Sequence, residues 1–174
     1  MRWSMHSDSS LANKADGGSW GGWAYAMETE EGMPTSGVFD YKCLSPRTFT
    51  DSTAASELVI ATAALKAILS HRMALKELNL LEDGPTSLFL DASAVINGAE
   101  MERVTRQMRF MAARYSMLRQ AVSSGRVTLE KVHTSLNKAD IFTKALTGED
   151  FKRCRALVMG LEYELPPDDE HISK

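Results

Sequence analysis

The sequence lacks the features that would place a protein outside the cell or in a membrane. It has only two cysteines, Cys43 and Cys154, and their spacing fits neither a disulfide framework nor a metal site. We expect both to be free thiols in a reducing compartment. The first 30 residues contain no apolar segment of the kind that a secretory signal requires. No run reaches the roughly 18 apolar residues of a membrane span, so we expect an intracellular protein with no membrane partner.

The sequence also lacks internal repeats, low-complexity tracts and a strong excess of charge of one sign. Its formal net charge is −3, so the chain as a whole is not an electrostatic binder of nucleic acid. A length of 174 residues with 44% hydrophobic residues predicts one domain with a substantial core. We place this domain at residues 1–161. Residues 162–174 are acidic and aperiodic, and we expect a disordered tail there.

The order of apolar patterns along the chain predicts an α/β fold with a mixed sheet. Residues 2–8, 20–27 and 35–42 are rich in aromatic and β-prone residues and predict an antiparallel meander. Oxygen-bearing side chains at Asp51, Ser52 and Thr53 offer an N-cap for a long helix. The elements that we expect after the meander are a helix over 51–78, a strand over 86–91, a helix over 92–99, a helix over 103–126, a strand over 127–132, and helices over 136–146 and 149–161.

The predicted helix over 103–126 has an apolar stripe at a period near 3.6 and an arginine-rich opposite face. The segment holds six arginines and no acid, which makes it strongly basic within an acidic chain. We expect this face to contact nucleic-acid phosphates, although a solvated helix surface explains the same pattern. The residues that we assign to the face are Arg103, Arg106, Arg109 and Arg114.

Four acids, Asp8, Glu57, Asp91 and Asp140, fall at strand ends or on helices of this scheme. Each alone has an ordinary explanation, as a helix cap or a solvated acid in a first turn. Together they suggest one carboxylate cluster at the edge of the sheet. Such a cluster is unfavourable unless cations neutralise it. Hard oxygen ligands favour Mg²⁺ or Mn²⁺, and a two-metal carboxylate site suits phosphodiester chemistry.

The local sequences around these acids resemble one family of nucleases. Residues 6–12 (HSDSSLA), 52–57 (STAASE), 88–95 (LFLDASAV) and 131–146 (KVHTSLNKADIFTKAL), followed by 151–155 (FKRCR), occur in the family's order. They are similar to the motifs of the ribonuclease H domain in copia-type LTR retrotransposon polyproteins. The resemblance extends from residue 5 to about residue 160.

The resemblance implies a ribonuclease H-like fold, with three antiparallel strands followed by two parallel strands and flanking helices. It implies hydrolysis of the RNA strand of RNA–DNA hybrids with two Mg²⁺ or Mn²⁺ ions. Asp8 would bridge the ions, Glu57 and Asp91 would complete the shell of one, and Asp140 would hold the other. The partner would be the polymerase portion of a reverse transcriptase, and the location a cytoplasmic particle or the nucleus.

The sequence departs from the family in segments expected to contact substrate. Residues 109–115 lack the usual histidine and aspartate, and Ala92 replaces an asparagine. Candidates for sensing the RNA 2′-hydroxyl are Ser9, Ser52, Thr53 and Ser56. His133 is a candidate for assisting product release, or else ordinary family variation.

Two other functions fit the same sequence. The chain could be a catalytically inactive ribonuclease H-like module that binds nucleic acid or protein, or a transposon relic. It could also be a DNA-directed nuclease or integrase of the same fold, although the spacing of the acids differs in that group.

Overall fold

The computed structural model describes residues 2–11, 18–29, 35–46, 52–81, 84–101 and 106–161. The expected tail over 162–174 lies outside these residues.

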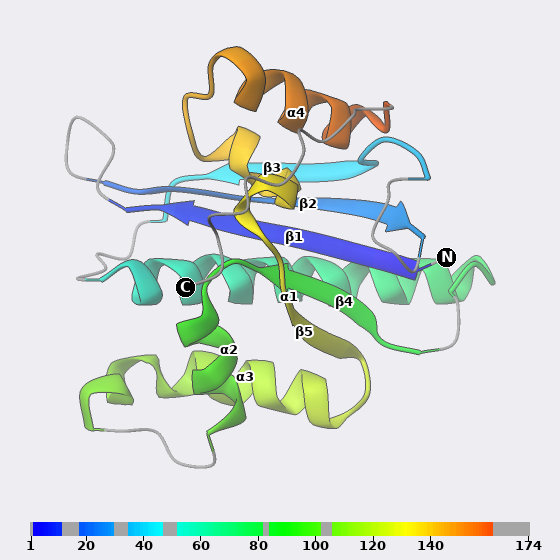
Figure 1. Cartoon of the computed structure of the whole chain (residues 1–174). Coiled ribbons are helices and arrows are strands. Elements are labelled where there is room, and N and C mark those ends of the chain that lie inside the picture. Colours follow the sequence, from blue (N-terminus) through cyan, green and yellow to red (C-terminus); the bar gives the residue numbers. More distant parts are fainter. Residues whose placement is uncertain are drawn as a thin grey trace.

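A five-stranded mixed sheet forms the centre of the molecule (Figure 1). Its strands are β1 (Arg2–Ser10), β2 (Trp20–Glu28), β3 (Asp40–Leu44), β4 (Thr86–Leu90) and β5 (Val127–Lys131), in the order β3-β2-β1-β4-β5. The first three strands pair antiparallel, whereas β4 pairs parallel with both β1 and β5. This topology confirms the prediction of three antiparallel strands followed by two parallel ones.

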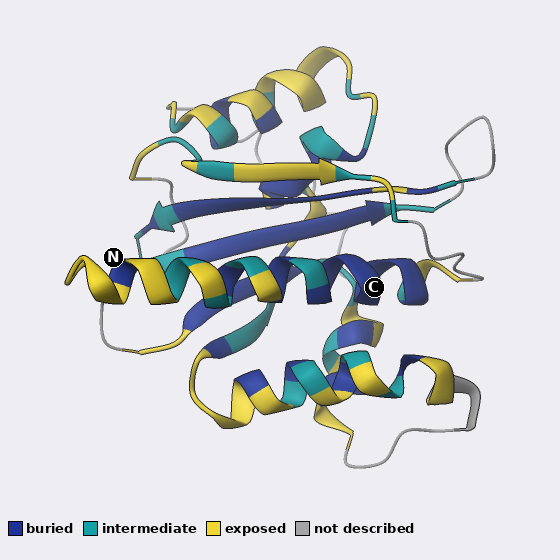
Figure 2. Ribbon diagram, turned by 180° about the vertical axis from the view of Figure 1, so that it is seen from behind, coloured by how far each residue is buried: buried dark blue, intermediate teal, exposed yellow. Residues whose placement is uncertain are grey.

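Helices cover both faces of the sheet (Figures 1 and 2). The long helix α1 packs on one face against β1, β2 and β4, with α2 and α3 beside it. On the other face, the 3₁₀ segment η3 packs against β1 and β2, and α4 lies over η3. The helical bounds are α1 Thr53–Glu77, α2 Ser93–Glu100, η1 Arg106–Met111, α3 Ala112–Ser123, η2 Thr134–Leu136, η3 Lys138–Phe142 and α4 Gly148–Met159.

Helix α1 begins where its sequence predicts. The Ser52 side chain accepts a hydrogen bond from the Ala55 backbone N–H at 3.2 Å, which satisfies one of the free donors of the first turn. Leu58, Leu65 and Ile68 lie on its buried face and anchor the core against the sheet. Figure 2 shows that burial is concentrated in the N-terminal half of the helix.

Helix α1 also corrects the expectation that no segment could span a membrane. By length and composition Thr53–Glu77 is long and apolar enough to do so, and half of its most apolar window is buried inside the molecule. Burial of this kind is typical of the core helix of a globular domain.

Three predicted elements differ from what their sequence patterns suggest. Strand β3 begins at Asp40 rather than at residue 35, because the preceding segment turns to meet α4, where the Val38 N–H donates to the Val158 carbonyl at 2.7 Å. The described part of the helix predicted over 103–126 is a 3₁₀ segment over Arg106–Met111 and an α-helix only from Ala112. Its first turns carry arginines and no acid, which the helix dipole disfavours at an N-terminus. The helix predicted over 136–146 is instead two short 3₁₀ segments, η2 and η3.

Two adjacent glycines on β2 allow both layers to approach the sheet. Added Cβ atoms would lie 2.1 Å from Ile60 of α1 at Gly21, and 2.7 Å from Phe142 of η3 at Gly22. Neighbouring strand residues point to opposite faces, so one glycine serves each layer. Gly22 also pairs with Asp8, so its missing side chain lets η3 lie directly beside that carboxylate.

We therefore expect Gly22→Ala to destabilise the fold by about 1–3 kcal/mol through overpacking. The new methyl group would meet the Lys42 carbonyl at 2.9 Å as well as Phe142, and a backbone atom in a sheet cannot easily move aside. Gly21→Ala should be milder, because the atoms that it meets are the flexible end of the Ile60 side chain. Urea unfolding of the two variants measures the difference, and equal losses would contradict this explanation.

Candidate metal centre

Asp8 and Asp91 meet because their strands are parallel neighbours. Ser7 of β1 pairs with Leu90 of β4, so the residue after each of these positions lies at the same level of the sheet. Asp8 is near the end of β1, and Asp91 follows directly after β4. Carboxyl ends of parallel strands commonly form binding sites for this reason.

Asp140 completes the cluster from η3. The Asn137 side chain caps this segment by accepting a hydrogen bond from the Ala139 N–H at 3.1 Å, the usual role of an N-cap residue. One carboxylate oxygen each from Asp8, Asp91 and Asp140 lies within 4.8 Å of the others. The structure therefore brings three of the four predicted acids together.

The fourth acid, Glu57, lies next to this group rather than within it. It is buried on α1, and its Oε1 accepts a hydrogen bond from the Ser9 backbone N–H at 3.1 Å. Burial, together with the charges of Asp8 and Asp91, raises the pKa of Glu57 from 4.5 to about 8. Glu57 is thus electrostatically coupled to the cluster although it does not share the three-residue site.

Two residues outside the predicted set, Thr143 and Lys144, stabilise the negative charge of the cluster. Thr143 donates its hydroxyl hydrogen to Oδ2 of Asp8. The Lys144 ammonium lies 2.9 Å from Oδ1 of Asp140 and 3.4 Å from Oδ2 of Asp8. Both follow Asp140 by three and four positions, the spacing that places side chains on one side of a helical turn. That spacing is the sequence feature from which Thr143 and Lys144 could have been selected.

Burial of the acids shifts their protonation. It raises the pKa of Asp8 from 3.8 to about 6, although the Thr143 hydrogen bond and the Lys144 charge oppose the shift. It also raises the pKa of Asp140, against the opposing contact with Lys144. Burial alone would lower the pKa of Lys144, but the nearby carboxylates raise it overall. When no divalent cation is bound, the carboxylates of the cluster therefore hold protons more tightly and contact the Lys144 ammonium group.

The residues present fit a divalent cation. The donor atoms are carboxylate oxygens, the hard ligands that Mg²⁺ and Mn²⁺ prefer. The buried Oε2 of Glu57 also has no hydrogen-bond partner among the described residues. A buried polar atom without a partner is unfavourable, and an additional cation beside Glu57 would relieve this.

The residues predicted to contact nucleic acid are dispersed. Ser9 and Ser56 are buried, whereas Ser52 and Thr53 are exposed at the start of α1. His133 is exposed and caps η2, where its Nδ1 accepts a hydrogen bond from the Ser135 N–H. Their contacts with substrate stay predictions.

Two of the four arginines assigned to the basic face are described. Arg109 is exposed, and Arg114 is partly exposed and donates a hydrogen bond to Thr62 of α1 at 3.0 Å. Contact of this face with nucleic acid stays a prediction. Arg103 and the Arg106 side chain lie outside the described residues.

The raised pKa values of Glu57 and Asp8 predict that these carboxyl groups make the metal-free protein less stable as pH rises, whereas the lowered pKa of buried His6 acts in the opposite direction. A carboxyl whose pKa is higher in the folded state binds more protons when folded, so stability falls between its ordinary and its raised pKa. For Glu57 this window extends from about pH 4.5 to about pH 8, at up to about 1.4 kcal/mol per pKa unit.

Thermal unfolding in EDTA across this window measures the effect. Glu57→Gln should flatten the profile, whereas Glu77→Gln, at the exposed end of the same helix, should leave it unchanged. An unaltered slope in Glu57→Gln would show that Glu57 does not carry the proton.

Comparison with known proteins shows the fold. No family model matches the chain, and no curated protein matches it in sequence. RNase H1 of the halophilic archaeon Halobacterium salinarum NRC-1 aligns with a TM-score of 0.58 at 14% identity, covering 82% of this chain and 95% of that one. LC11-RNase H1, isolated from compost and solved with an RNA/DNA hybrid, gives 0.53 at 11% identity, with 82% and 94% covered.

A third similar structure is the protease-reverse transcriptase of Prototype Foamy Virus, with a TM-score of 0.50 at 14% identity. The match covers 94% of this chain and 21% of the viral one. At such low identities a structural likeness establishes architecture rather than activity. The chain has the ribonuclease H-like fold.

Proposed function

We propose that this chain is a metal-dependent endonuclease that hydrolyses the RNA strand of RNA–DNA hybrids. The observation that carries the proposal is the convergence of Asp8, Asp91 and Asp140 within 4.8 Å at the edge of a ribonuclease H-like sheet. A protein with this fold, LC11-RNase H1, forms a complex with an RNA/DNA hybrid, which supports the choice of substrate.

The three aspartates would hold Mg²⁺ or Mn²⁺, and Glu57 would join them to accommodate a second ion. Such ions, when bound, activate a water molecule and stabilise charge on the leaving oxygen. Because Oε1 of Glu57 accepts the Ser9 N–H, the proton that Glu57 carries at neutral pH resides on Oε2. That proton must leave before Glu57 can act as a ligand. Lys144 must likewise withdraw from Asp8 and Asp140.

Substrate would approach the cluster from the side of Asp91. Asp8 and Asp140 are buried, whereas Asp91 is partly exposed and lies beside the exposed residue Lys131. Lys131 contacts the Asp91 carbonyl, so its ammonium lies at the entrance to the site. With Lys144, it offers positive charge for the scissile phosphate, where electrostatic attraction favours nucleic-acid binding.

A retrotransposon origin of the copia type rests on the motifs around the four acids. The foamy virus protease-reverse transcriptase includes the same fold within a much longer chain. By analogy, we propose a reverse transcriptase polymerase portion as the natural partner of this domain. A cytoplasmic particle or the nucleus would then be its location.

Two observations favour a second function, a ribonuclease H-like module that binds hybrid without cutting it. Glu57 lies outside the three-residue site, and residues 109–115 differ from the family's pattern. A single-ion site would bind nucleic acid through its cation yet lack the second ion that hydrolysis requires.

Incubation of the purified chain with a labelled RNA–DNA hybrid, in Mg²⁺ or in EDTA, separates these functions. We expect Mg²⁺-dependent cleavage of the RNA strand alone. Asp91→Asn removes a predicted metal ligand. It should therefore lower the cleavage rate by more than about 100-fold, the upper range for substitutions of residues that only orient metal ligands. Asp150→Asn, an exposed acid of α4, is the matched control and should retain full activity.

Each other outcome contradicts the proposal in a defined way. Hybrid binding without cleavage would identify the binding module. Cleavage of duplex DNA would identify a DNA-directed nuclease. Equal activity of Asp91→Asn and the unmodified chain would separate any nuclease activity from the carboxylate cluster.

A further inference from the structure

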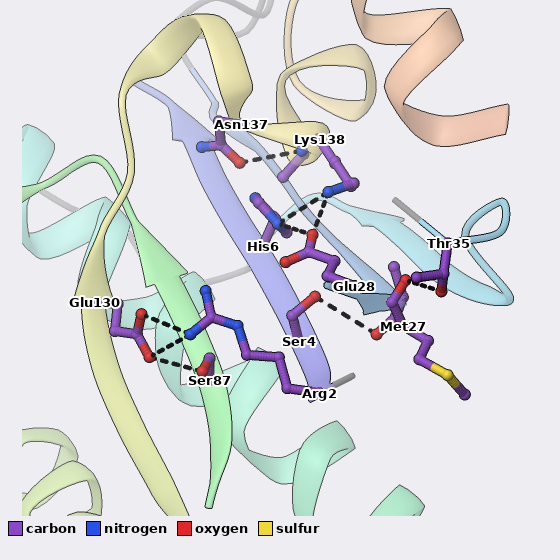
Figure 3. A network of polar contacts seen from close by, with 12 residues as sticks. Arg2, Ser4, His6, Met27, Glu28, Thr35, Ser87, Glu130, Asn137 and Lys138 are labelled. Atoms are coloured by element: carbon purple, nitrogen blue, oxygen red, sulfur yellow. Dashed lines mark hydrogen bonds and ion pairs between the residues drawn. The ribbon is translucent and has the colours of Figure 1, made fainter. Parts of the chain in front are cut away.

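A second group of titratable side chains, drawn in Figure 3, is buried between the sheet and η3. Lys138 of η3 forms an ion pair with Oε1 of Glu28 on β2. The Nε2 atom of His6 on β1 lies 2.8 Å from the same Oε1 and 3.4 Å from the Lys138 ammonium. The three residues are 1%, 0% and 3% exposed, respectively. The network thus joins three separate segments inside the protein.

Stability alone does not explain this network. Buried ion pairs are commonly no better for stability than apolar residues of similar volume, because both charges lose their hydration. Oε2 of Glu28 and Nδ1 of His6 have, in addition, no hydrogen-bond partner among the described residues. A polar group buried in this way lowers stability. An arrangement of this kind is better suited to specifying one geometry, a role that some buried polar networks have.

The network lies where it can set the position of a predicted metal ligand. Lys138 precedes Asp140 by two residues, and His6 precedes Asp8 by two. Next to Lys138 in the chain, the Asn137 side chain donates a hydrogen bond to the carbonyl of Ser7, which lies between His6 and Asp8, at 3.2 Å. The chain leading to Asp140 is therefore tied to the sheet at two points.

We propose that Lys138, Glu28 and His6 are positioning residues that hold η3 against β1 and β2 and keep Asp140 within reach of Asp8. Through that distance they set the affinity of the carboxylate cluster for a divalent cation. The cation part of this inference rests on the proposed function. The holding of η3 does not, so the two are tested by separate measurements.

The full-length chain, freed of metal with EDTA, allows both measurements. Binding of Mn²⁺ is followed by electron paramagnetic resonance, and amide hydrogen exchange is followed at Ala139, whose N–H is bonded to Asn137. Lys138→Met should weaken Mn²⁺ binding by about 10- to 100-fold, the range found for residues that orient metal ligands. It should also accelerate exchange at Ala139 by about tenfold or more, because the segment opens locally.

The double variant Glu28→Gln/Lys138→Met distinguishes positioning from folding. It leaves no lone charge buried, so its melting temperature should equal or exceed that of the unmodified chain. Its Mn²⁺ affinity should nevertheless stay about tenfold low or lower, because the tie from η3 to β2 is gone. This variant also decides the matter if Lys138→Met alone does not fold.

Glu130→Gln is the matched control. Among the described residues, the hydrogen-bond and ion-pair partners of the Glu130 side chain are Arg2, Ser87 and Thr128, all on the strands of the sheet (Figure 3 shows Arg2 and Ser87). Its Mn²⁺ affinity and its Ala139 exchange should match those of the unmodified chain.

Recovery of both Mn²⁺ affinity and Ala139 exchange to unmodified levels in the double variant would overturn the positioning role. If the unmodified chain binds no Mn²⁺, the proposed function fails, and Ala139 exchange alone decides whether the network holds η3. Unchanged exchange in Lys138→Met would then overturn the inference.

Discussion

Repulsion among carboxylates at one edge of the sheet is the constraint on which the rest of the structure depends. Asp8, Asp91 and Asp140 hold oxygen atoms within 4.8 Å of one another in a largely buried site, and like charges so close resist joint ionisation. The parallel pairing of β1 with β4 brings the first two acids together. The glycine opposite Asp8 lets η3 bring the third. Strand pairing and the close approach of η3 thus hold the carboxylates together against their mutual repulsion.

In the metal-free protein, bound protons and the Lys144 ammonium group reduce this repulsion. Glu57 and Asp8 hold protons more tightly than free acids do, and Lys144 contacts both Asp8 and Asp140. A divalent cation entering the cluster must displace these positive charges. Metal binding, proton release and movement of Lys144 are therefore expected to be linked, as they are wherever ligands must deprotonate to bind.

Local patterns in the sequence predict the scaffold and all three clustered acids. Asp8 and Asp91 follow directly from strand ends, and the N-cap at Ser52 follows from helix chemistry. Features set by contacts between distant segments could not be read in this way. Strand β3 starts late because the segment before it bonds to α4, and the hydrogen bond from Arg114 to Thr62 joins two helices that are far apart in the sequence. No local pattern singles out Lys138, and only its contact with Glu28 reveals it.

A crystal structure of the chain grown with Mn²⁺, examined by anomalous scattering, tests the central claim most directly. Anomalous density is expected between the carboxylates of Asp8, Asp91 and Asp140, with Lys144 displaced from Asp8 and Asp140. An absence of density there at saturating Mn²⁺, with the Lys144 ammonium still bonded to both acids, would contradict a cation-binding role for the cluster.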